Sequence, residues 1–202
     1  MKNEIQCIIS GKSKVRHGTI IQTTLNYLTR SQSSSTLAKE DKHFKREETT
    51  RLKVFINSQN LWVSDIKLEN YVSEGAEQKV YLKNDKTVIK LNDAIFYISW
   101  IDYFHNLLLH NYFFPDTSYQ LLGFYENNSD LYAVVEQPYV KATEETDLYA
   151  VKQFMINNGF TNTRNNDYLN SDLGLIIEDL HDENVLSRNG VLCFIDTVFF
   201  II

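Results

Sequence analysis

The stretch Asp179-Leu-His-Asp-Glu-Asn184, followed twelve residues later by Asp196 in Phe194-Ile-Asp-Thr197, indicates a site that handles a metal ion and phosphate. A carboxylate and an amide oxygen, such as those of Asp196 and Asn184, are hard ligands suited to Mg²⁺. A further carboxylate can accept a proton from a hydroxyl group. The alternative is that these acids only cap a turn and pair with surface bases. That alternative is weaker for Asp196, because an acid within an apolar stretch is rarely buried without a partner or metal.

His181 lies inside this loop and has three interpretations: a base, a metal ligand, or a hydrogen bonder that staples the loop. No other His or Cys lies at a spacing typical of metal sites. We therefore predict the third role.

Upstream of the loop, Lys90 lies in the apolar segment Val88-Ile-Lys-Leu91, which predicts a strand. Alternate residues of a strand share a face, so we expect Lys90 and Val88 on the same side. An ammonium group on an inward face needs an anion, whereas on an edge strand it extends to water. A preceding turn at Gly75 and Ala76 would let backbone N–H groups approach phosphates.

Hydrophobic periodicity predicts an alternation of helices with strand pairs along the chain. Strands are expected at residues 79–83, 87–91, 119–125, 131–135, 185–188 and 191–195, and helices at residues 17–31, 37–60, 94–110 and 144–157. Turns are expected at 84–86, 126–130 and Asn189-Gly190, and Asn-Gly between apolar segments is a strong hairpin signal.

The charge of the chain is unevenly distributed. Residues 1–53 carry eleven Lys and Arg against five acids, whereas the remainder carries nine against twenty-one. A basic segment before an acidic body predicts docking onto that body or onto an anionic protein partner, and the alternative is plain solvation of the segment. Nucleic acid is a less favoured partner, because the body is acidic and no nucleic-acid-binding motif is present.

The composition indicates a soluble globular protein of 202 residues, with 43% hydrophobic and 23% charged residues. Cys7 and Cys193 are too far apart and too few to suggest a disulfide framework. The N-terminus lacks the apolar core of a signal peptide, and no apolar stretch is long enough to span a membrane. The expected location is the cytoplasm.

These motifs, taken together, resemble those of a known family. Asp179-Leu-His-Asp-Glu-Asn-Val-Leu186 is similar to the catalytic loop of aminoglycoside-phosphotransferase-type kinases, and Ile195-Asp196 resembles their metal site. Val88-Ile-Lys90 resembles the third-strand lysine motif of kinases. The chain as a whole, including His110-Asn-Tyr-Phe-Phe-Pro115, looks most like the kinase domain of bacterial and phage polyvalent proteins.

The resemblance implies ATP and Mg²⁺ as cofactors and a role for each matching residue. Lys90 would hold the α- and β-phosphates, and Asp179 would be the catalytic acceptor for the hydroxyl of a protein or small-molecule substrate. Asn184 and Asp196 would bind the metal. The nucleotide would be covered by the segment that includes Gly75, Ala76 and Val80, and its adenine would be framed by Glu136, Gln137 and Tyr139.

The implied fold is an α+β, reduced form of the protein kinase. It comprises a basic helical N-terminal arm (1–60), a small antiparallel-sheet N-lobe (61–140) and a truncated, mainly helical C-lobe (141–202) with the catalytic and metal-binding loops.

Three departures from the kinase pattern support an alternative function. No Glu occurs between Asn92 and Pro115, so the usual helix partner of Lys90 is missing, and Asp102 is the suggested substitute. Thr197 and Val198 follow Asp196 in place of Phe-Gly, and no activation segment follows. The alternative is a pseudokinase or nucleotide-binding regulatory module without transfer activity.

Overall fold

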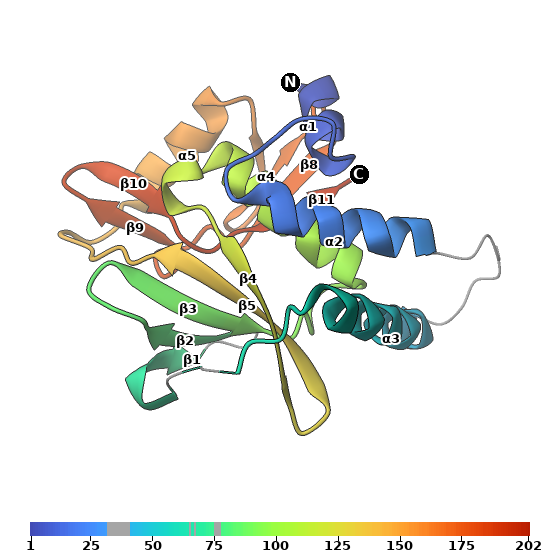
Figure 1. Cartoon of the computed structure of the whole chain (residues 1–202). Coiled ribbons are helices and arrows are strands. Elements are labelled where there is room, and N and C mark those ends of the chain that lie inside the picture. Colours follow the sequence, from blue (N-terminus) through green and yellow to red (C-terminus); the bar gives the residue numbers. More distant parts are fainter. Residues whose placement is uncertain (32–40, 65, 67, 75–77) are drawn as a thin grey trace.

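The computed structural model describes residues 1–31, 41–64, 66, 68–74 and 78–202, and it combines helices with antiparallel sheets (Figure 1). No helix among these residues is long and apolar enough to cross a membrane. The α-helices are α1 (Lys2–Ile9), α2 (Gly18–Ser31), α3 (Asp41–Gln59), α4 (Trp100–Phe113) and α5 (Leu148–Asn157), with short 3₁₀ helices at η1 (Leu68–Asn70) and η2 (Pro115–Thr117).

An antiparallel five-stranded sheet, in the order β1-β2-β3-β5-β4, forms one side of the molecule. The strand pairs expected at 79–83 with 87–91 and at 119–125 with 131–135 are confirmed, with small differences at their ends. In the predicted first turn, the Asn84 side chain accepts hydrogen bonds from the backbone N–H groups of Lys86 and Thr87. The strands are β1 (Tyr71–Glu74), β2 (Gln78–Leu82), β3 (Thr87–Asn92), β4 (Gln120–Asn127) and β5 (Asp130–Pro138).

The helix predicted from residue 94 begins later, at Trp100. The side chain of Asn92 accepts a hydrogen bond from the backbone N–H of Ala94, which has a φ of 57° and so leaves the right-handed helical region. Ser99 then caps the helix, because its Oγ accepts a hydrogen bond from the N–H of Asp102. Apolar composition alone did not reveal this side-chain-stabilised turn.

The prediction of a mainly helical C-lobe is wrong. Residues 141–202 are all described, and they form one helix, α5, and six strands. Helices from earlier in the chain supply the missing cover, since Ile5 of α1 and Leu109 of α4 share a buried cluster with Ile177 and Phe199. The strands are β6 (Thr161–Arg164), β7 (Asp167–Asn170), β8 (Leu175–Glu178), β9 (Val185–Arg188), β10 (Val191–Phe194) and β11 (Val198–Ile201).

Strands β9 and β10 form the hairpin that the Asn-Gly dipeptide predicts. Val191 pairs with Arg188, and the two turn residues have φ values of 52° at Asn189 and 74° at Gly190. Tight two-residue hairpins of this kind require positive φ at both central positions, which Asn and Gly adopt readily.

The N-terminal helices pack onto the body of the protein. The predicted helix at 17–31 corresponds to α2, and the one at 37–60 corresponds to α3 from Asp41, since residues 37–40 lie outside the described part of the chain. Leu28 of α2 and Ile56 of α3 are buried in one cluster with Trp100 and Phe104 of α4. On the surface, Lys53 Nζ of α3 lies 3.0 Å from Glu126 Oε1 of β4. The structure thus favours docking of the basic segment on the body.

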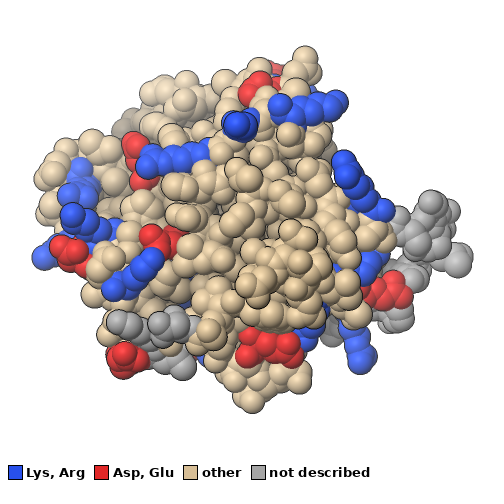
Figure 2. Space-filling model, in the orientation of Figure 1, with Lys and Arg blue, Asp and Glu red and all other residues tan. Residues whose placement is uncertain are grey.

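The face shown in Figure 2 carries no continuous basic patch among its described residues. Lys and Arg side chains are scattered there among acidic and uncharged ones. Binding to nucleic-acid phosphates typically uses a clustered array of such cations. The visible arrangement therefore offers no such array on this face.

A buried carboxylate lies where α3 meets α4. Glu48 is fully buried, and its Oε2 accepts a hydrogen bond of 2.5 Å from the backbone N–H of Trp100, in the first turn of α4. Burial raises the pKa of Glu48 to about 7, although backbone hydrogen bonds from Trp100 and Ile101 and the charge of Arg51 act in the opposite direction. This contact makes the packing of α3 on α4 sensitive to pH.

Candidate active site

A cleft of about 460 Å³ lies between the five-stranded sheet and the β9–β10 hairpin. Val80, Val88 and Lys90 line it from β2 and β3, and Asn184 and Asp196 line it from the opposite side. Asn184 immediately precedes β9, and Asp196 follows β10. The hairpin therefore brings together two candidate metal ligands that the sequence separates.

Lys90 is buried in this cleft, on the same face of β3 as Val88, as strand alternation predicts. Its side chain is 5% exposed, and its Nζ donates to the Ile195 carbonyl at 3.0 Å and lies 3.7 Å from Asp196 Oδ2. The Tyr119 ring also faces the ammonium group, with its centroid 5.3 Å from Nζ. Burial lowers the pKa of Lys90, and the charge of Asp196 acts against that shift.

The suggestion that Asp102 replaces the missing acidic partner of Lys90 is wrong. Asp102 lies in the first turn of α4, where its Oδ2 accepts a hydrogen bond of 2.7 Å from Ser99 Oγ. It thus completes the cap of its own helix. Lys90 pairs instead with Asp196. The two residues bond reciprocally, because the Asp102 N–H donates to Ser99 Oγ, and sequence spacing alone does not reveal this local pairing.

Asp196 connects several elements around the cleft. Its Oδ2 accepts a hydrogen bond from the side-chain amide of Gln78, on β2. Its Oδ1 lies 3.4 Å from the Tyr119 hydroxyl, and its backbone N–H donates to the Asn184 carbonyl at 3.2 Å. The Asp196 side chain remains 29% exposed. Because it is partly exposed, the Asp196 carboxylate can still contact a ligand in the cleft while Gln78 and Tyr119 remain beside it.

The loop from Asp179 to Asn184 is held by its own side chains. Asp179 has a φ of 67°, and its Oδ2 and backbone carbonyl each accept a hydrogen bond of 2.9 Å from Asn184 Nδ2. His181 Nδ1 accepts from the Glu183 N–H, so we assign the proton to Nε2, which lies 3.3 Å from Asp179 Oδ1. The predicted stapling role of His181 is confirmed. The Asp179 carboxylate is 58% exposed and does not line the cleft wall.

A family model described as a serine/threonine/tyrosine kinase found in polyvalent proteins matches residues 45–202. The chain belongs to this family. The match begins within α3 and contains Lys90, Asp179, Asn184 and Asp196. No curated protein and no solved structure matches the chain. The fold and the family together identify a kinase-like domain of α+β architecture.

The residues that the resemblance assigns to the nucleotide occupy different positions in this kinase-like domain. Glu136 does not line the cleft, because its side chain forms an ion pair with Lys83 on the other side of the sheet. Gly75 and Ala76 lie outside the described residues. Three other residues that the resemblance assigns to the nucleotide do line the cleft, namely Val80, Gln137 and Tyr139.

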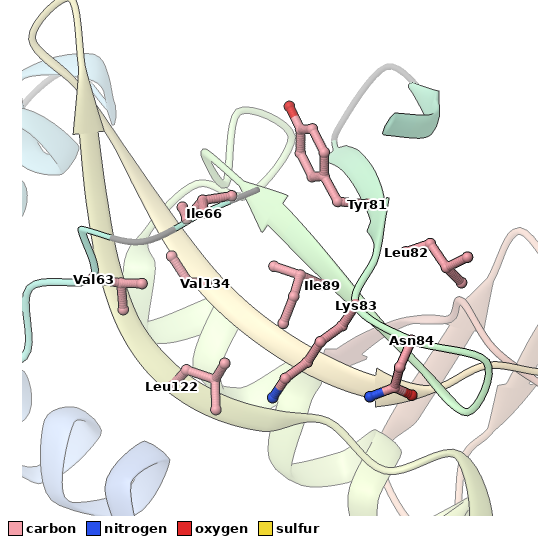
Figure 3. A pocket seen from close by; sticks show the side chains of 9 residues that line it. All are labelled: Val63, Ile66, Tyr81, Leu82, Lys83, Asn84, Ile89, Leu122 and Val134. Carbon is pink, nitrogen blue, oxygen red and sulfur yellow. The ribbon is translucent and has the colours of Figure 1, made fainter. Parts of the chain in front are cut away.

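The outer face of the same sheet carries a separate apolar cavity of about 360 Å³ (Figure 3). Ile89, Leu122 and Val134 line it, and the Lys83 side chain extends toward Leu122. Ile89 and Lys90 are consecutive on β3, so they point to opposite faces of the sheet. This cavity therefore lies away from the candidate site, and none of the predicted site residues lines it.

A buried polar network behind the cleft was missed by sequence reasoning. His110 of α4 lies with Nδ1 2.8 Å from Thr197 Oγ1 and Nε2 3.0 Å from the Thr117 carbonyl. Burial lowers the pKa of His110 to about 3, so the ring is neutral. Gln137 Nε2 donates to the carbonyls of Thr117 and Ile195. These contacts hold the segment around Asp196, and they join residues so distant in sequence that no local signal predicts them.

Leu186 is a further cleft residue that sequence reasoning passed over, although a signal was present. It lies two positions after Asn184, and both residues line the cleft. Alternate residues of an extended segment share a face, so the position of Asn184 predicts that of Leu186.

Proposed function

We propose that the domain transfers the γ-phosphoryl group of Mg·ATP to a hydroxyl group on a protein or small molecule. The observation that carries the proposal is the arrangement of Lys90, Asn184 and Asp196 around one cleft, with Asp179 hydrogen-bonded to Asn184 at its edge. Phosphoryl transfer depends on positioning and on neutralising phosphate charge, so these groups match its main requirements.

Lys90 is suited to bind the phosphates. Its ammonium group is buried and now interacts with Asp196 and the Ile195 carbonyl. A buried cation requires an anionic partner, and phosphate oxygens in the cleft would supply one. Val80, Val88 and Leu186 offer apolar surface in the same cleft for the base of the nucleotide.

The donor set of the cleft fits Mg²⁺ held jointly with phosphate. No group of three or more His, Cys, Asp or Glu side chains among the described residues could hold a metal alone. Mg²⁺ is commonly held by one or two protein oxygens, substrate phosphates and water. Asn184 uses its Nδ2 toward Asp179, and its Oδ1 has no hydrogen-bond donor among the described residues. Asn184 Oδ1 and the Asp196 carboxylate would hold the ion, which would neutralise charge on the phosphates.

Asp179 is suited to orient the acceptor and take its proton. Its carboxylate is exposed beside the cleft and held by Asn184 and His181. In the transfer step, the acceptor oxygen bonds to the γ-phosphorus and the bond from that phosphorus to the ADP oxygen breaks. The acceptor proton passes to Asp179. The family description, which names serine, threonine and tyrosine, supports a protein acceptor.

Substitutions in the cleft provide the test of nucleotide binding. Lys90→Met and Asp196→Asn keep side-chain size while removing charge, and each is expected to weaken binding of a non-hydrolysable Mg·ATP analogue by roughly tenfold or more. Lys86→Met, at an exposed lysine in the β2–β3 turn, is the matched control and should bind like wild type. Binding is measured by calorimetry, and folding is checked by thermal unfolding.

Two results would contradict the proposal. One is a wild-type protein that does not bind Mg·ATP. The other is unchanged affinity in folded Lys90→Met and Asp196→Asn, which would place the nucleotide elsewhere.

A further inference from the structure

Lys90 lacks the acidic partner on the following helix that usually fixes the strand lysine of a kinase. In protein kinases that lysine forms an ion pair with a Glu of the following helix. Here the acid of α4, Asp102, bonds to the capping residue Ser99. The His110 imidazole of α4, which the charge of Lys90 affects, is neutral. Lys90 is held instead by Asp196 and the Ile195 carbonyl, so the groups that fix these two partners matter for its position.

Tyr119, just before β4, contacts both members of the Lys90–Asp196 ion pair in the cleft. Its hydroxyl donates to the Ile195 carbonyl at 2.9 Å, the same carbonyl that accepts from Lys90 Nζ. The hydroxyl also lies 3.4 Å from Asp196 Oδ1, and the ring faces the Lys90 ammonium at 5.3 Å.

Tyr119 is itself fixed by α4. Its backbone N–H donates to Asn111 Oδ1 at 2.7 Å, and its carbonyl accepts from Asn111 Nδ2 at 2.8 Å. The His110 ring packs on the Tyr119 ring, with centroids 4.5 Å apart. The aromatic group therefore has little freedom to move away from Lys90.

We propose that Tyr119 is a positioning residue that takes the place of the helix carboxylate. This inference rests on the proposed function of Lys90 and Asp196. The hydroxyl holds the Ile195 carbonyl and thereby the position of the adjoining Asp196, and the ring stabilises the ammonium through a cation–π interaction. Because Tyr119 is neutral, Lys90 can exchange Asp196 for a phosphate without breaking an ion pair to α4.

Two substitutions separate these contributions. Tyr119→Phe removes only the hydroxyl, and it should raise the Mg²⁺ concentration that half-saturates nucleotide binding roughly fivefold while metal-free ADP binding stays near wild type. Tyr119→Leu also removes the ring, and it should weaken metal-free ADP binding by roughly two- to fivefold as well. Tyr125→Phe, on β4 but packed against the outer cluster of the sheet, is the control and should change neither quantity.

The outcomes distinguish a positioning role from packing alone. Unchanged Mg²⁺ and ADP affinities in both Tyr119 variants would overturn the inference while leaving the proposed function intact. A lower thermal midpoint in Tyr119→Phe with equal losses in both affinities would also overturn it, because it would show a role in packing only. Absence of nucleotide binding by wild type would overturn the inference together with the proposed function.

Discussion

Asp179→Asn is expected to lower the rate of phosphoryl transfer by roughly 10²- to 10⁴-fold, because it removes the proton acceptor while preserving the loop. Asn tolerates the positive φ of 67° at this position. Its side-chain oxygen can still accept the hydrogen bond that Asn184 donates to Asp179 at 2.9 Å. Mg·ATP binding should therefore stay close to wild type. The measurement is transfer of labelled γ-phosphate to the protein itself, to Ser, Thr and Tyr peptides and to small alcohols.

Asp182→Asn is the matched control for this substitution. Asp182 lies in the same loop, with its side chain 67% exposed and its Oδ1 3.8 Å from His181 Nδ1. That contact is with a residue that does not line the cleft, so the substitution should change transfer little. Equal rates for wild type and Asp179→Asn would exclude Asp179 as the proton acceptor.

Binding without transfer would point to the alternative function. If wild type bound Mg·ATP but transferred no phosphate to any acceptor tested, the domain would be better described as a nucleotide-binding regulatory module. In that case Lys90→Met should still weaken nucleotide binding, because the phosphate contact does not depend on turnover.

Glu48→Gln is expected to stabilise the fold by about 2–3 kcal/mol at pH 8 and to have a much smaller effect at pH 5. The pKa of Glu48 is raised to about 7 in the folded protein, mainly by burial, from an ordinary value of 4.5. The folded state therefore holds this proton more tightly than the unfolded state. The stability that this provides is complete below pH 4.5 and is lost as pH rises through 7. Gln is neutral throughout and can still accept from the Trp100 N–H.

Urea unfolding at several pH values between 5 and 8 measures this difference in free energy. Glu145→Gln, which removes an exposed acid, is the control and should not reproduce the pH-dependent gain. A Glu48→Gln protein that is less stable than wild type at pH 8 would contradict the prediction. It would show that the ionised carboxylate is favoured at the start of α4, through its contact with Arg51 or with the helix.

Short-range patterns determined much of the site. The alternation around Lys90 predicts that it shares a face with Val88, and the Asn189-Gly190 turn predicts the hairpin between Asn184 and Asp196. Such features depend on residues a few positions apart, whose geometry the backbone sets directly.

Other expectations failed because distant packing decided the outcome. The prediction of a mainly helical C-lobe was wrong, because residues 141–202 form mostly strands. Helices α1 and α4 from earlier in the chain cover these strands, and local propensity does not reveal such distant packing. The start of α4 was wrong because the Asn92 side chain stabilises a turn in an otherwise apolar stretch.

The sequence by itself determined the family, the order of the motifs and the residues of the loop from Asp179 to Asn184. Only the tertiary structure decided that Lys90 pairs with Asp196 and that Tyr119 lies against both of them. It also decided that Asp102 bonds to Ser99, the residue that caps α4. The reason is physical. A buried charge takes whichever partners the packed fold brings within a few ångströms, and those partners lie up to about a hundred residues away along this chain.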